Sequence, residues 1–393
     1  SVIIKPRKKR ENAMRSLPHV HDQLVFDCEQ FAALLSVLWK RGYQVIGPVV
    51  HNQAIVYDTL TSVADLPIGY TDEQDGGKYR LKKRADEAFF GYAVGPHSWK
   101  KYLHPPLVRL WQGRREGKDF QMLPEELPSS RYAFIGVRSC ELHAIAIQDR
   151  VFLRNDYTDP TYQARKKDLF IVAINCGQAG GTCFCTSMQT GPEVTFGYDL
   201  VLTEILEASV HYFVVQVGSD PGAEVLDEIS CRRANENELR KAQQVVASTA
   251  SQMGRHMPVS PLEVKDLLAR NLEHARWEDV AQRCLSCTNC TMVCPTCFCT
   301  TVEDVTDLLG EQAERVRKWD SCFTLDFSYI SGGSIRTSTK SRYRQWMTHK
   351  LSTWYDQFGT SGCVGCGRCI TWCPVGIDIT EEVHAIHASE KEK

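Results

Sequence analysis

Alternating hydrophobic and polar positions predict short helices and strands over the first two thirds of the chain. Apolar residues recur at helical spacing over residues 28–41, and Gly42 is expected to end that helix. A second helix is predicted over residues 236–253. Runs rich in β-branched residues predict strands at 44–50, 54–57, 194–203 and 212–217. The polar, glycine-rich stretch 70–85 is expected to be a loop or a sheet edge.

One stretch predicts parallel strands. Residues 132–137 form a run typical of a buried strand, residues 141–153 carry apolar side chains at helical spacing, and residues 169–174 form the next apolar run. A strand, a helix and a second strand in this order favour parallel pairing of the two strands. The N-terminal region is therefore expected to be mixed α/β.

A turn-rich segment at 257–261 separates this region from the rest of the chain. Ser260 and Glu263 have the spacing of a capping box, and Pro261 would occupy the first position of a new helix. We therefore expect two domains, residues 1–257 and 258–393. The overall class is α+β, with a mainly helical second domain.

The charge and the length of the apolar runs exclude two classes of protein. The 46 Lys and Arg residues nearly balance the 48 Asp and Glu residues, which gives no electrostatic basis for nucleic-acid binding. The apolar stretches 31–39 and 210–217 are shorter than the ~20 residues of a membrane-spanning helix, and no signal-peptide pattern opens the sequence. We expect a cytoplasmic protein without a membrane span.

Cysteine usage indicates metal chemistry. The chain has seventeen cysteines, and most of them lie after residue 283. Several form tandem triplets whose members are too close together for a set of unstrained disulfides. The thiols are therefore expected to be metal ligands.

The C-terminal part contains the spacing C-x2-C-x2-C-x3-C-P twice. This is the spacing of bacterial ferredoxins, in which three thiolates bind one 4Fe-4S cluster and the fourth ligates the other cluster. Cluster one would use Cys284, Cys287, Cys290 and Cys373; cluster two would use Cys363, Cys366, Cys369 and Cys294. Structural zinc sites instead use cysteine pairs separated by a long spacer, so a zinc-stabilised scaffold is the weaker alternative. Glycines beside the second triplet would let the backbone approach the sulfurs closely: Gly362, Gly365 and Gly367.

An insertion at about 295–362 separates the two repeats. It contains Cys297, Cys299 and Cys322, which have no fourth cysteine. These three thiols would need a non-cysteine ligand such as His349 to hold another cluster. Buried, redox-inert thiols are an equally good interpretation.

A second group of cysteines is predicted at one edge of the sheet. Cys140 and Cys176 each follow a predicted strand, and the glycine-rich loop 177–182 leads to Cys183 and Cys185. Because open α/β sheets assemble sites at the carboxyl ends of their strands, these four thiols are expected to converge. A third iron–sulfur cluster is the preferred interpretation, and zinc or buried thiols remain open.

No catalytic residue is expected, because electron transfer through clusters needs ligation and a suitable dielectric but no general base. The sequence contains no G-x-G-x-x-G after a strand and no Walker A run. Four residues near the cysteines could either contact the ligands or simply pack in the core or at the surface: Glu141, His143, Arg368 and Trp372.

Several motifs together resemble one family. The segments 136–145, 183–188, 294–299, 342–350 and 363–369 are similar to the β subunit of soluble, NAD(P)-linked nickel-iron sulfhydrogenases, a family that also includes an electron-transfer subunit of anaerobic sulfite reductase. The resemblance covers most of residues 130–385. It implies a protein that carries electrons between a flavin-containing diaphorase subunit on one side and the nickel-iron hydrogenase, with its small and large subunits, on the other.

Three alternatives remain at this point. A siroheme sulfite reductase subunit could replace the hydrogenase as the terminal partner. A zinc-stabilised scaffold would carry no electrons and would be colourless. A self-sufficient reductase would turn over its own small substrate at the sheet edge.

Overall fold

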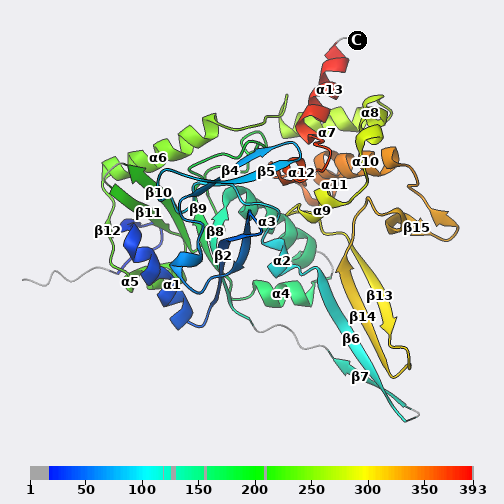
Figure 1. Ribbon diagram of the computed structural model, residues 1–393, viewed down its shortest axis with the longest axis horizontal. Helices are drawn as coiled ribbons and strands as arrows, with labels where there is room; N and C mark the ends of the chain where they lie inside the picture. The colour runs from blue at the N-terminus through cyan, green and yellow to red at the C-terminus, as the bar shows by residue number, and fades with distance from the viewer. Residues whose placement is uncertain (1–16, 118, 125–129, 155–156, 208–209, 392–393) are drawn as a thin grey trace, which may run out of the picture.

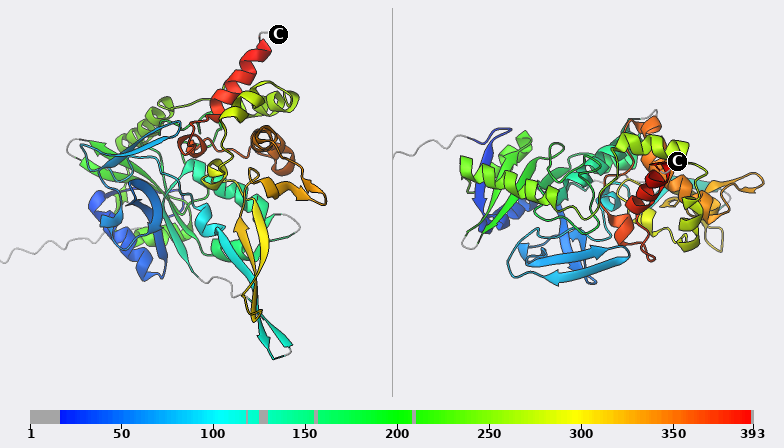
Figure 2. Two further views of the ribbon diagram at one scale, coloured as in Figure 1. Left: turned by 45° about the vertical axis from the view of Figure 1, so that its right-hand side comes forward. Right: turned by 90° about the horizontal axis from the view of Figure 1, so that it is seen from above.

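The computed structural model describes residues 17–117, 119–124, 130–154, 157–207 and 210–391 (Figure 1). The fold is mixed α/β, as predicted. It has a large sheet flanked by helices, a projecting four-stranded arm, and a C-terminal body of short helices and cysteine-bearing loops (Figures 1 and 2). No helix in these ranges is long and apolar enough to cross a membrane.

The large sheet has eight strands. In spatial order they are β12 (Arg232–Arg233), β1 (Gln23–Asp27), β11 (Val210–Val217), β10 (Leu200–Glu207), β9 (Phe170–Ile174), β8 (Tyr132–Arg138), β2 (Gln44–His51) and β3 (Ala54–Thr59). The central strands β2, β8, β9 and β10 run parallel, and the outer pairs are antiparallel. The predicted parallel pairing of the strands on either side of helix α3 (Ser139–Leu153) is confirmed.

Helices cover both faces of this sheet. Successive side chains of a strand point to opposite faces. On β1, Phe26 packs in the core that contains helices α1 (Phe31–Lys40) and α5 (Asp220–Asp227), whereas Val25 packs in the core that contains α6 (Glu236–Ser251). The predicted helix stop is confirmed, since Gly42 adopts a φ of 81° just after α1.

One local prediction needs correction, and another is made more specific. The strand expected at 194–203 begins only at Leu200, because Gly197 has a φ of 76° and the Asp199 carboxylate accepts a hydrogen bond from Ile171 N at 2.7 Å. The stretch expected to be a loop or edge forms a hairpin of β4 (Tyr70–Asp75) and β5 (Lys78–Lys83), which turns at Gly77 with a φ of 68°.

The C-terminal body begins with α7 (Pro261–Arg270), whose start agrees with the capping box predicted at Ser260 and Glu263. Its other helices are α8 (Arg276–Arg283), α9 (Asn289–Met292), α10 (Thr339–Thr348), a π-helical turn at His349–Thr353, α11 (Trp354–Phe358), α12 (Arg368–Thr371) and α13 (Ile379–Lys391). Their shared apolar core includes Trp277, Met347 and Val383. The first cysteine triplet joins α8 to α9, and the second leads into α12.

The arm combines strands from distant parts of the sequence (Figure 1). Strands β13 (Thr300–Thr306) and β14 (Gln312–Trp319) come from the insertion between the repeats, and they pair with β6 (Leu107–Glu116) and β7 (Asp119–Pro124). The insertion at about 295–362 therefore contains a β-hairpin in addition to helices. Because this sheet joins residues from both sides of the predicted boundary at 257/258, that boundary stays a prediction.

Where the arm joins the main body, a buried histidine gives the fold a pH dependence. The His104 ring packs against Phe152 and Trp319, and both of its nitrogens lack a partner among the described residues. Burial, followed by the positive charges of Arg317 and Lys100, lowers the pKa of His104 to about 3. The unfolded chain binds this proton below about pH 6.5, so the stability contributed by neutral His104 is lost as the pH falls from about 6.5 towards 3.

A His104→Phe chain is expected to lose less stability on acidification. Between pH 6 and 5, the slope of the unfolding free energy should be smaller than that of the wild type by up to about 1.4 kcal/mol per pH unit. Urea unfolding at pH 7, 6 and 5 measures this slope. His51, which is exposed, provides the control substitution, and equal slopes for the wild type and His104→Phe would contradict the prediction.

Candidate iron–sulfur centres

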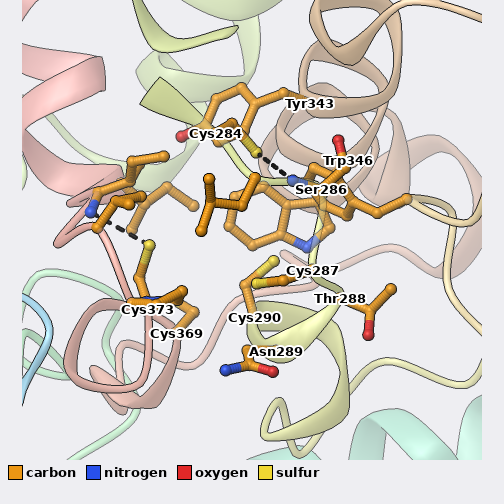
Figure 3. Close-up of a pocket in the computed structure, with 16 residues that line it drawn as sticks. Cys284, Ser286, Cys287, Thr288, Asn289, Cys290, Tyr343, Trp346, Cys369 and Cys373 are labelled. Carbon is orange, nitrogen blue, oxygen red and sulfur yellow. Dashed lines mark hydrogen bonds between the residues drawn. The ribbon is translucent and has the colours of Figure 1, made fainter. Parts of the chain in front are cut away.

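The four thiols predicted for cluster one lie around one cavity. Cys284, Cys287 and Cys290 line it from the first repeat, and Cys373 lines it from the second (Figure 3). Cys369 also reaches its wall. Apolar and aromatic side chains close the remaining sides: Phe323, Tyr343, Trp346, Ile377 and Ile379. The structure therefore brings together cysteines from two repeats that are about eighty residues apart.

The backbone around this cavity donates hydrogen bonds to sulfur. Ser286 N lies 3.4 Å from Cys284 Sγ, and Ile377 N lies 3.3 Å from Cys373 Sγ (Figure 3). Ser286 and Thr288 adopt left-handed backbone conformations, with φ of 50° and 69°, which wrap the first triplet around the cavity. Such N–H groups stabilise the thiolate form that a cluster requires.

The cluster-two thiols form a second, more buried group. Burial, and then the neighbouring thiols of Cys363, Cys366 and Cys294, raise the pKa of Cys369. Gly365 N donates to Cys363 Sγ at 3.4 Å. Cys294 comes from the first repeat and acts on Cys369, as Cys373 of the second repeat lines the first cavity. The exchange of fourth ligands between the two clusters stays a prediction.

A buried lysine lies beside Cys294. The Lys350 ammonium donates to Thr296 Oγ1 at 2.9 Å and to Gly362 O at 3.1 Å, and Thr296 Oγ1 is in turn 3.2 Å from Cys294 Sγ. A hydrogen bond from Cys297, and then the charge of Lys350, hold the pKa of Cys294 well below its usual value. The site thus provides positive charge for thiolate ligands.

The second predicted group of thiols lies at the carboxyl ends of two neighbouring parallel strands, β8 and β9. Cys140 lies in the first turn of α3, Cys176 follows β9, and Cys183 and Cys185 lie in the loop beyond it. Burial and then Cys185 raise the pKa of Cys140, and burial and then Cys183 and Cys176 raise that of Cys185. Cys183 Sγ lies 4.0 Å from Cys366 O, so this group lies beside the second cysteine triplet.

Glu141 is the centre of a buried polar network beside these thiols. Its side chain is 1% exposed and pairs with Arg368 at 2.6 Å, and the Arg368 side chain is 5% exposed. The carboxylate also accepts from Tyr57 Oη at 2.7 Å, from Trp99 Nε1 at 3.1 Å and from Arg138 N at 3.1 Å. The ion pair joins helix α3 to the cluster-two loop.

The other residues named beside the cysteines have different surroundings. Arg138 Nη2 donates to Phe90 O and Tyr92 O, whereas its buried Nη1 has no partner among the described residues. His143 packs edge-on against Phe196 in a surface cleft that also reaches Cys363. Trp372 stacks on Tyr79 at 5.3 Å. The sequence analysis did not identify Arg138. The feature that could have indicated it is its position at the end of a buried strand, two residues before Cys140.

The three insertion cysteines come together without His349. A hydrogen bond from Cys322 lowers the pKa of Cys299 to about 7. Cys297 donates a hydrogen bond to the thiol of Cys294. The nearby Lys100 is buried and donates to Cys297 O at 3.2 Å. His349 Nε2 instead pairs with Gln357 Oε1 at 2.8 Å, and its ring packs on Trp354. In this structure His349 does not approach the three thiols through these contacts, and its role as a ligand stays a prediction.

The loops of cluster two and of the Cys140 group interlock. Phe184 N donates to Gly365 O at 2.8 Å. A Cβ on Gly365 would lie 2.7 Å from Cys185 N, and one on Gly367 would lie 2.3 Å from Thr182 O. Both glycines have positive φ, 64° and 72°, so these two positions require glycine for conformation and for space.

The donor set fits iron–sulfur chemistry, because cysteine thiols line the cavity and backbone N–H groups donate to two of them. Within the described ranges, no three His, Cys, Asp or Glu side chains are grouped closely enough to hold a single metal ion. The cluster-one wall also has buried donors without an acceptor, Tyr343 Oη and Trp346 Nε1, and sulfide could accept from them.

Comparisons with known proteins agree with this chemistry. Residues 283–377 match the family model described as a 4Fe-4S dicluster domain. The chain is 29% identical over 358 residues to sulfhydrogenase 2 subunit beta of Pyrococcus furiosus, which covers 89% of this chain and 94% of that protein. No solved structure matches. The resemblance found in the motifs is thus confirmed, and the chain contains a 4Fe-4S type of domain.

Proposed function

We propose that this chain is the iron–sulfur electron-transfer subunit of a multisubunit hydrogenase. The observation that carries the proposal is that Cys373 lines the cavity of the first triplet while Cys294 acts on Cys369 of the second, as the crossed ligands of a two-cluster ferredoxin would. The similarity to a sulfhydrogenase β subunit over most of both chains supports the choice of hydrogenase.

The exposure of the cysteines supports an order for the centres. Cys287 is exposed, whereas all other cysteines are buried or partly buried. Around it, Leu285 is 63% exposed and Val375 is 38% exposed. We infer that cluster one is the surface end of the relay, that cluster two lies behind it, and that a partner protein docks over the apolar rim at Leu285 and Val375.

A third 4Fe-4S cluster is proposed at Cys140, Cys176, Cys183 and Cys185. These thiols lie next to Cys366, and the unpaired Arg138 Nη1 supplies a buried positive donor in the same neighbourhood. After burial, the charge of Arg138 is the largest influence on Cys176, and it lowers the pKa of that thiol. This location would extend the relay from cluster two to the sheet edge.

Cys297, Cys299 and Cys322 are the candidate for one more centre. The buried ammonium groups of Lys100 and Lys350 would offset the negative charge of thiolates there. Such a centre needs a ligand other than cysteine, so three structural thiols are the alternative interpretation. Iron content decides between the two.

The mechanism that we propose uses ligation and exclusion of water. A bound 4Fe-4S cluster supplies reversible one-electron chemistry. The thiolates hold it, the buried cations and backbone N–H groups stabilise negative charge, and side chains such as Phe323 and Ile377 keep water from cluster one. No general base takes part. The proposed partners are the small and large nickel-iron hydrogenase subunits and a flavin diaphorase subunit.

Native anaerobic purification with metal analysis tests this function. We expect about eight irons per chain from the two ferredoxin-type clusters, about twelve with the third, and co-purifying nickel with hydrogen-dependent viologen reduction. Co-purifying siroheme would contradict the hydrogenase partner and would indicate a sulfite reductase as the terminal partner instead. A colourless chain with stoichiometric zinc and no reducible paramagnetic centre would overturn the electron-transfer function.

A further inference from the structure

Two buried donors in the cluster-one cavity lack a protein acceptor. Trp346 Nε1 and Tyr343 Oη have no hydrogen-bond partner in the part of the chain that the structure describes, although their residues are only 5% and 2% exposed. An unpaired buried N–H or O–H costs free energy, and most such groups in folded proteins are paired. Their missing acceptor therefore needs a physical explanation.

Both donors belong to one face of helix α10. Residues three apart on a helix are neighbours, and the Trp346 and Tyr343 rings lie 5.5 Å apart. Phe323 packs against both rings, at 5.8 and 6.2 Å, and fixes their orientation. This face lines the cavity of Cys284, Cys287, Cys290 and Cys373. In Figure 3 the indole nitrogen is on the ring edge that faces Cys287 and Cys290.

Another aromatic donor of the same core is satisfied by the protein. Trp277 is fully buried in this core, and its Nε1 donates to Asn271 O at 2.8 Å. Among the described residues of this core, the indole N–H and the hydroxyl without a partner belong to Trp346 and Tyr343, and both residues line the cysteine cavity.

We propose that Trp346 and Tyr343 donate hydrogen bonds to sulfur atoms of cluster one and raise its reduction potential. The inference rests on the proposed function. Reduction adds one electron to the cluster and increases the negative charge on its sulfurs, while no proton is transferred. Donors directed at those sulfurs stabilise the reduced form more than the oxidised form. The two residues tune the reduction potential of the cluster, and neither transfers a proton or an electron itself.

The test uses the full chain, reconstituted anaerobically with iron and sulfide. Trp346→Phe and Tyr343→Phe remove the donors, and Trp277→Phe is the matched control in the same core. EPR-monitored redox titration with dithionite measures the ratio of reduced to oxidised cluster one at a fixed potential. In Trp346→Phe and in Tyr343→Phe this ratio should be at least threefold lower than in the wild type. Iron content and the titration of cluster two should be unchanged, and the control should match the wild type.

A second measurement needs no substitution. In the wild-type chain labelled with 15N-tryptophan, pulsed EPR of reduced cluster one should detect a 15N coupling and an exchangeable proton. Absence of both, or full iron content with an unchanged cluster-one titration in Trp346→Phe and Tyr343→Phe, would overturn the inference and leave the proposed function intact. A wild-type chain without a reducible cluster would instead overturn the proposed function.

Discussion

A Cys373→Ala chain is expected to lose the cluster of the first repeat and to keep the cluster of its own repeat. Cys373 lines the cavity of Cys284, Cys287 and Cys290, so alanine would leave one iron of cluster one without a thiolate. Iron content should fall by about four atoms per chain. The reduced protein should then show the EPR signal of a cluster without its coupled partner.

Matched variants identify which cluster is lost. Cys287→Ala removes a proposed ligand of cluster one within the first triplet, and Cys366→Ala removes a proposed ligand of cluster two within the second. Cys373→Ala should leave the same residual spectrum as Cys287→Ala, and Cys294→Ala should leave that of Cys366→Ala. If Cys373→Ala instead resembles Cys366→Ala, the ligands do not cross between the repeats.

Removing Arg368 is expected to destabilise the protein by about 3–5 kcal/mol, because it leaves the Glu141 carboxylate buried without its cation. The Arg368→Met chain also loses the hydrogen bond from Arg368 Nε to Gly95 O. Urea unfolding measures the loss. The double variant Glu141→Gln/Arg368→Met should recover part of it, because neither charge then remains buried alone.

An exposed ion pair of the same chain gives the comparison. Arg270 pairs with Glu390 at 2.7 Å, and its side chain is 55% exposed. Arg270→Met should cost less than about 1 kcal/mol, since water and salt screen a surface pair. A loss for Arg368→Met as small as that for Arg270→Met would contradict the role assigned to the buried pair.

Local sequence patterns were sufficient for several parts of the structure. The two cysteine triplets are defined by spacing within one loop, and the capping box at Ser260 is defined by four neighbouring residues. The parallel pairing of β8 and β9 follows from the order of three adjacent segments. In each case the residues that determine the feature are close together in the chain.

Contacts between distant residues could not be predicted in this way. Glu141 and Arg368 are 227 positions apart, and their pairing depends on how the sheet packs against the cluster loops. The arm pairs β6 with β14 across about two hundred residues. The hydrogen bond of His349 with Gln357 likewise depends on how the chain folds after residue 348. A pattern of residue types contains no information on which long-range partner prevails.

The interlocked loops at Thr182–Cys185 and Gly365–Gly367 affect how the protein can be divided. Phe184 N and Gly365 O share a hydrogen bond, and neither glycine leaves room for a side chain. A fragment limited to the two repeats would lack the surface on which its second metal-binding loop is shaped. The C-terminal part resembles a ferredoxin in its cysteine spacing, but we expect that, expressed alone, it would not shape this loop, because its partner loop belongs to the sheet region.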